Sequence, residues 1–124
     1  MSRLHNPGPG EILDRLTILA LKIVHGQMAG RDITHWVEER DALDNLKVPN
    51  IPILRVVELA AVNGALWQAE DDLRRERTAT EHYVSQTAVI AQTAIRIQQL
   101  NDRRAALVSL INVNAGVDRP PDKL

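Results

Sequence analysis

The chain has 124 residues, which suggests one domain that buries roughly two-thirds of its unfolded surface. Its 15 basic and 16 acidic side chains nearly cancel, and this balance argues against binding a nucleic-acid polymer, which requires a basic face. There is no Cys, so disulfides and thiolate chemistry are excluded and a four-ligand zinc site is not expected. The absence of Cys is compatible with a cytoplasmic protein, and we expect that location.

The composition favours close-packed helices. The apolar residues make up 44% of the chain, Phe is absent, and the aromatic residues are Trp36, Trp67 and Tyr83. Residues 1–10 lack the pattern of a secretory signal. The most apolar run, residues 12–24, is too short and too charged to cross a bilayer, so we expect no membrane contact.

Turn residues and hydrophobic periodicity divide the chain into helices. Asn6-Pro7-Gly8-Pro9-Gly10 predicts a non-helical lead-in over residues 1–10, and 26–30 predicts the end of the first helix. Asp32 or Thr34 is expected to cap the second helix. A single helical domain over 11–113 is followed by a loose tail over 114–124. The helices are expected at about 11–25, 34–46, 53–77 and 81–113.

The first predicted helix is apolar around much of its circumference. Its main stripe is Ile12, Leu16, Leu19 and Ile23. The polar residues on the opposite face are Glu11, Asp14, Arg15, Lys22 and His25. Ile18 falls within that polar face, and Leu21 lies at its margin. Such a helix is either central or packed against a second chain, which favours a homo-oligomer.

The third predicted helix carries two stripes. The first has the spacing of a buried face: Leu59, Val62, Leu66, Ala69 and Leu73. The second lies about a quarter-turn away: Asn63, Trp67, Glu70 and Arg74. Polar groups at the edge of a buried face are half hidden and must find partners.

The fourth predicted helix has an apolar seam with two polar interruptions. The seam is Tyr83, Thr87, Ile90, Ala94, Ile97, Asn101, Arg104, Val108 and Ile111. Asn101 and Arg104 can act as registry devices that fix helix pairing and oligomeric state, or they can belong to a ligand site. In an antiparallel hairpin they are offset from the polar stripe of the third helix. The two sets meet only if another chain or the first helix, through Asp14, Arg15, Lys22 or His25, brings them together.

The functional interpretation is a polar pocket with one flat aromatic wall. Arg offers forked donors to phosphate or carboxylate, Asn recognises an amide or base edge, and Trp stacks on a ring. Taken by itself, Trp67 favours a role in the core over that of a ligand platform. The candidate ligand-binding residues are Arg15, Asn63, Trp67, Glu70, Arg74, Asn101 and Arg104.

Metal-dependent catalysis is the main alternative. Glu38, Asp41 and Asp44 place acids three apart on the second helix, and 70–72 is a dense acidic run. All-helical nucleotide pyrophosphohydrolases hold magnesium with such pairs on adjacent helices. Here only the second helix carries acids three residues apart. The simpler interpretation is that Glu38, Asp41 and Asp44 form a solvent-exposed helix face. No two of the histidines have the i, i+4 spacing of a zinc-binding helix. We predict no catalytic residue, metal or cofactor.

Three blocks of sequence resemble a known family. They are GEILDRLTIL at 10–19, VNGALWQAED at 62–71, and NDRRAAL at 101–107 followed by Ile111-Asn112. In this order they are similar to a domain-of-unknown-function family of short all-helical proteins from bacteria and their phages. The resemblance covers most of the chain but not residues 117–124. It implies a helical fold and assigns no activity.

The sequence therefore predicts an all-α antiparallel bundle of about four helices, two of them long, assembled as a homo-oligomer. The expected function is non-enzymatic: holding or sequestering a small anionic or nucleotide-like ligand at a subunit or helix interface, in a protein that fits a phage setting. One alternative is a magnesium-dependent nucleotide hydrolase using Glu38, Asp41 and Glu70. Another is a structural interaction module that docks through Ile18 and Leu21.

Overall fold

The computed structural model describes residues 7–46, 48–78 and 84–117. Within these ranges the chain is all-helical, which confirms the predicted fold class. The helices are α1 (Pro9–Met28), α2 (Thr34–Asp44), α3 (Ile53–Thr78) and α4 (Val84–Asn114). The predicted start of the last helix at 81 and most of the predicted tail lie outside the described residues. No helix in the described ranges combines the length and apolarity needed to cross a bilayer.

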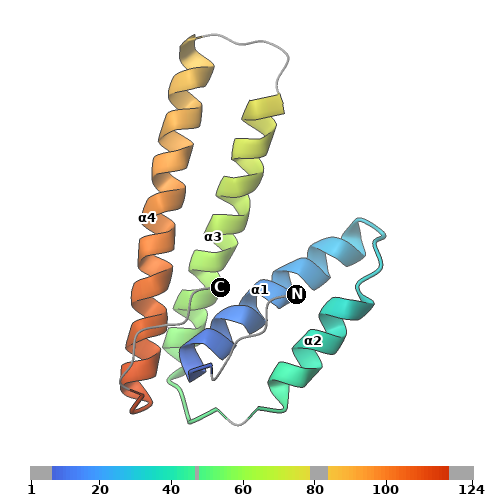
Figure 1. The fold of residues 1–124 in the computed structure, drawn as a ribbon. Coiled ribbons are helices and arrows are strands. Elements are labelled where there is room, and N and C mark those ends of the chain that lie inside the picture. The colour runs from blue at the N-terminus through green and yellow to red at the C-terminus, as the bar shows by residue number, and fades with distance from the viewer. Residues whose placement is uncertain (1–6, 47, 79–83, 118–124) are drawn as a thin grey trace.

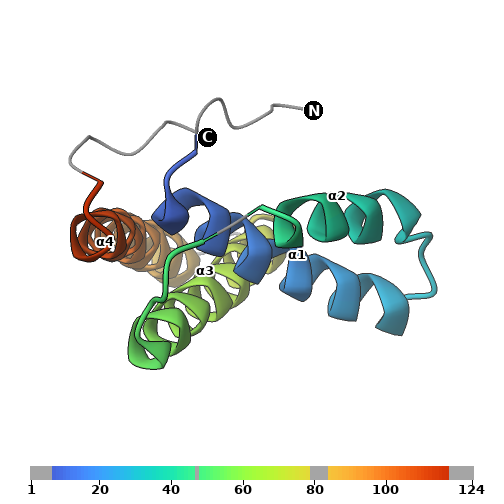
Figure 2. The same ribbon diagram turned by 90° about the horizontal axis from the view of Figure 1, so that it is seen from below.

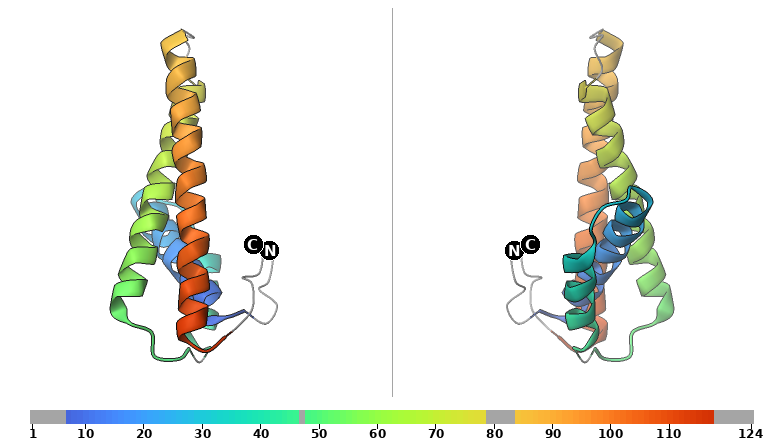
Figure 3. Two further views of the ribbon diagram at one scale, coloured as in Figure 1. Left: turned by 90° about the vertical axis from the view of Figure 1, so that its left-hand side faces the viewer. Right: turned by 90° about the vertical axis from the view of Figure 1, so that its right-hand side faces the viewer.

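The long helices α3 and α4 form an antiparallel hairpin, and α1 lies obliquely across the half that holds the start of α3 (Figure 1). α2 runs back beside α1, the only described helix whose backbone it approaches closely (Figure 2). The far half of the hairpin extends beyond α1 and α2 (Figure 3). The hairpin is therefore covered by α1, with α2 beside α1, at one end, and α3 and α4 pack only against each other at the other end.

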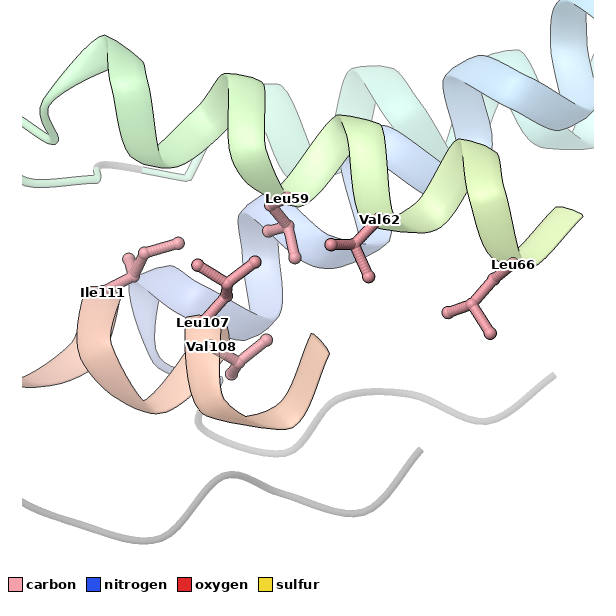
Figure 4. Packing of buried hydrophobic residues seen from close by; sticks show 6 residues of the cluster. All are labelled: Leu59, Val62, Leu66, Leu107, Val108 and Ile111. Atoms are coloured by element: carbon pink, nitrogen blue, oxygen red, sulfur yellow. The ribbon is translucent and has the colours of Figure 1, made fainter. Parts of the chain in front are cut away.

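The core lies where α1 crosses the hairpin. Leu59, Val62 and Leu66 of α3 face Leu107, Val108 and Ile111 of α4 (Figure 4). The predicted α3 stripe is confirmed: its first four members are buried and Leu73 is half-buried. The predicted α4 seam is only partly correct, because Asn101 and Ala94 are exposed while Thr93 and Leu107 are buried. The buried face of α4 is rotated from the predicted one, and Asn101 is not in it.

The N-terminal turn of α1 is pressed against α4. A Cβ atom on Gly10 would lie 2.4 Å from the carbonyl oxygen of Val108, so only glycine allows this approach. The prediction of a non-helical lead-in is wrong for Pro9 and Gly10, which open the helix; proline suits a first helical turn because no N–H is needed there. Asn112, 0% exposed, joins the two helices by accepting from the Gly10 N–H and donating to Glu11.

The other end of α1 is shaped by its contact with α2. The helix continues past Gly26, which was predicted to begin its end. Gly26 is buried because Ile33 and Trp36 pack directly against it. A Cβ atom at this position would lie 2.8 Å from both side chains, so a larger residue would not fit without a shift. The chain reverses instead at Gly30, whose φ is +69°. The N-cap residue of α2 is Ile33, which makes no side-chain cap hydrogen bond, so the prediction of Asp32 or Thr34 as the cap is wrong. Asp32 lies one residue earlier, and its carboxylate accepts a 3.0 Å hydrogen bond from the N–H of Thr34, the first residue of α2.

Candidate ligand site

Asp14 joins the three helices at the centre of the crossing. It is 2% exposed and accepts hydrogen bonds from Asn63 Nδ2 of α3 at 2.9 Å and from Arg104 of α4. Arg104 Nε lies 2.9 and 3.0 Å from the two carboxylate oxygens, and its Nη2 donates a further bond. The prediction that α1 would bring the two offset polar sets together is confirmed for Asp14. The polar face of α1 is thus buried here, because α3 and α4 both supply donors for it.

Arg15 points away from this junction toward α2. Its Nε lies 2.6 Å from Glu39 Oε2, and its Nη2 donates to the other carboxylate oxygen at 2.9 Å. The forked pair raises the pKa of Arg15 above its ordinary value and lowers the pKa of Glu39, in both cases mainly through the hydrogen bond between them. Arg15 therefore attaches α2 to α1, and the structure does not group it with the other predicted ligand residues.

A basic hollow of about 390 Å³ lies at the C-terminal end of α1, between α2 and the second half of α3. Its charged and aromatic lining residues are Lys22, His25, Arg31, Trp36, Trp67, Asp71, Arg74 and Arg75. Asp71 is the single carboxylate, and it pairs with Arg74 at 3.4 Å and Arg75 at 2.9 Å. Neither Lys22 nor Arg31 forms a salt bridge with a described residue.

Trp67 forms one wall of the basic hollow. Its indole stacks on the His25 ring with centroids 4.5 Å apart and planes 12° apart. Trp67 is half-buried, so it is neither a fully enclosed core residue nor a free platform. The stack with His25 covers one face of the indole and restricts its orientation.

A second, smaller hollow of about 240 Å³ adjoins the first. The two share Lys22 and Trp67 as lining residues. The other residues of the second hollow are Ile18, Leu21, Asn63, Leu66, Glu70 and Arg104. Ile18 and Leu21, which the sequence predicted as an interaction face, are half-buried in its wall.

The structure therefore divides the predicted site residues into groups. Asn63, Trp67, Glu70 and Arg104 line the second hollow. Trp67 and Arg74 line the basic hollow. Arg15 is paired with Glu39, and Asn101 is exposed on α4 outside both hollows. Their role in ligand binding stays a prediction.

Several lining residues were not among the predicted site residues. Arg31 follows α1 in a turn and Arg75 lies beyond the predicted polar stripe of α3. Lys22 and His25 were predicted only as residues of the first helix that could connect the two polar sets, and Trp36 was noted only as one of the aromatic residues. No spacing in the sequence connects these residues, because α1, α2 and α3 converge here only through the crossing of α1.

The acidic residues of the metal hypothesis do not converge. Glu38, Asp41 and Asp44 are exposed on α2. Within the described ranges, no three His, Cys, Asp or Glu side chains are grouped as a metal site would require. Glu70 lies on α3 in the second hollow, whose lining residues include no other carboxylate.

The fold and the site define an all-α protein with a basic cavity walled by tryptophan. Comparison with protein-family models, with curated proteins and with solved structures gives no match. The resemblance to a domain-of-unknown-function family accordingly stays a prediction. Any function must be argued from the site itself.

Proposed function

We propose that the protein binds a small, multiply charged anion in the basic hollow and acts as a binding or sequestering protein. The observation that carries this proposal is the lining of the hollow, where Lys22, Arg31, Arg74 and Arg75 face one carboxylate, Asp71. A cavity of this size is within the range of small-molecule sites, about 300–1,000 Å³. In a chain whose net charge is −1, this hollow thus places four cationic side chains around one carboxylate.

The charge balance outweighs the one opposing feature. The C-terminal end of α1 borders the hollow, and a helix C-terminus carries a partial charge of about −0.5. Lys22 and Arg31, which form no salt bridge with a described residue, each carry a full positive charge and together outweigh this partial charge. Guanidinium groups bind phosphate through paired hydrogen bonds, and the salt bridges of Asp71 with Arg74 and Arg75 hold those groups in place at the wall.

The test is titration calorimetry of the purified chain with inorganic pyrophosphate, preceded by native mass spectrometry to detect any anion that co-purifies. A hydrogen bond to a charged group contributes about 1.5–3 kcal/mol, and Arg31 is exposed. We therefore expect Arg31→Ala and Lys22→Ala each to weaken pyrophosphate binding by about tenfold.

The matched control is Arg103→Ala. Arg103 is an exposed residue of α4 that lines neither hollow, and its removal changes the net charge by the same amount. It should change the affinity by less than about twofold at 0.15 M salt, where distant surface charges are screened. Equal losses in all three variants would show a general charge effect, and no binding by the wild type would reject the proposal.

We further infer that the chain self-associates through the outer face of α3. Its large exposed side chains are Ile53, Leu54 and Val57, which are 80, 60 and 56% exposed. They are followed by small residues on the same face: Ala60, Ala61, Gly64 and Ala65. A Cβ atom on Gly64 would meet no atom within 4 Å. Antiparallel pairing of two copies about Ala60 and Ala61 places Val57 of each copy opposite Gly64 of the other, which allows close helix packing there.

The oligomeric state of two matched valine variants tests this interface. Val57→Lys places a charge in the paired face and should shift sedimentation or light-scattering mass to the monomer. Val24→Lys changes an equally exposed valine, 53% against 56%, on α1, and should leave the mass unchanged. A wild-type monomer, or equal dissociation in both variants, would contradict the inference.

A further inference from the structure

We infer that the second hollow binds the flat ring of the same ligand, and that this ring presents adjacent hydrogen-bond donors, as the guanine of a nucleotide does. The inference rests on the proposed function of the basic hollow, which would hold the phosphates. The two hollows share Lys22 and Trp67, so one ligand can extend from one to the other across these two side chains.

The second hollow has a different chemistry from the first. Ile18, Leu21 and Leu66 give it an apolar wall, which suits a ring rather than a phosphate. Its carboxylate, Glu70, is exposed and forms no salt bridge with a described residue. A carboxylate repels phosphate and accepts hydrogen bonds, so this hollow favours a neutral group that carries N–H donors.

The orientations of the other two polar side chains, Asn63 and Arg104, are set by their hydrogen bonds to Asp14. Arg104 donates to Asp14 through Nε and Nη2, and Asn63 donates from Nδ2 to Asp14 and to Thr17. The assignment of the Asn63 amide follows from these partners, because only its nitrogen can donate to a carboxylate. Asn63 Oδ1 therefore remains as an acceptor in a side chain that is 3% exposed and lines the hollow.

Trp67 supplies the surface on which a ring can stack. His25 lines the basic hollow but not the second one, so the His25–Trp67 stack covers the indole from the side of the basic hollow. Trp67 is also a lining residue of the second hollow, whose lining does not include His25. Stacking on tryptophan tolerates any base, whereas the acceptor Glu70 distinguishes between them: guanine offers N1–H and its 2-amino group, and adenine offers one amino group beside an acceptor nitrogen.

The experiment compares GDP, IDP, ADP and inorganic pyrophosphate by titration calorimetry on the wild type and on Glu70→Gln. A paired contact with a base discriminates by about 10- to 100-fold. We expect GDP to bind wild type at least tenfold more tightly than ADP, with IDP, which lacks the 2-amino group, in between. Glu70→Gln should remove this preference and leave pyrophosphate binding unchanged or slightly tighter, since a negative charge near Lys22 is removed.

Glu38→Gln, at an exposed acid of α2 outside both hollows, is the control and should keep the GDP preference. Equal affinity of wild type for GDP, IDP and ADP, or an unchanged preference in Glu70→Gln, overturns the inference. If pyrophosphate still binds and depends on Lys22 and Arg31, the proposed function survives that result. If pyrophosphate does not bind, the proposed function fails as well.

Discussion

The Asp14–Arg104 pair provides the sharpest test of how the fold is held together. We consider Arg104→Met, which keeps most of the side-chain length and removes the guanidinium. The Asp14 side chain is 3% exposed and that of Arg104 is 23% exposed, so the variant leaves a carboxylate buried with Asn63 as its remaining side-chain donor. Removing one partner of a buried ion pair costs about 3–5 kcal/mol.

This loss is large for a chain of this size. At about 0.05–0.15 kcal/mol per residue, 124 residues give a total stability of roughly 6–19 kcal/mol. The unfolding midpoint should fall by about 10–20 °C. Thermal and urea unfolding followed by circular dichroism measure it, and Arg103→Met, at the neighbouring exposed arginine, should change stability by less than about 0.5 kcal/mol.

A double variant separates the pair from its surroundings. Asp14→Leu with Arg104→Met removes both charges and should recover most of the stability, because an apolar replacement of a buried pair is often neutral. A cost below about 1 kcal/mol for Arg104→Met alone would refute the reasoning. If Arg104→Ala instead abolished ligand binding in a fully stable oligomer, the ligand role predicted for Arg104 would be supported over the structural one.

Three further outcomes follow from individual contacts. Gly10→Ala should destabilise the chain by about 1–3 kcal/mol in urea unfolding, because its Cβ would lie 2.4 Å from the Val108 carbonyl oxygen. At Gly64 an added Cβ atom would meet no atom within 4 Å of the same chain. Gly64→Ala should therefore raise the unfolding free energy of the monomeric chain by up to about 1 kcal/mol. Glu39→Gln should cost about 1 kcal/mol at neutral pH. Because Arg15 lowers the pKa of Glu39 from 4.5, this difference is present above the unfolded pKa and should vanish as the pH falls through the folded one.

The sequence alone determined the helices and the packing face of α3. Periodic Leu, Val and Ala residues at 59–69 predicted one buried stripe. Turn residues at 26–30 and 47–52 predicted the divisions between the first three helices, although α1 continues past Gly26 to Met28. Local geometry decides these features, so spacing is enough to predict them. The half-buried position of Trp67 followed from the same rule, whereas Asn63, expected at the same edge, is fully buried against α1.

Tertiary structure decided which polar residues meet. Asp14 lies on the polar face of an amphipathic helix, and only the oblique crossing of α1 over α3 and α4 buries it against Asn63 and Arg104. The same crossing turns Arg15 toward Glu39 and requires glycine at position 10. The buried face of α4 also differs from the predicted one by a rotation about the helix axis, and Asn101 is therefore exposed. Helical spacing specifies the angle of a side chain about the axis of its own helix. The basic hollow is formed by residues of α1, α2 and α3, so it depends on how these helices pack against one another, and spacing within one helix cannot predict that packing.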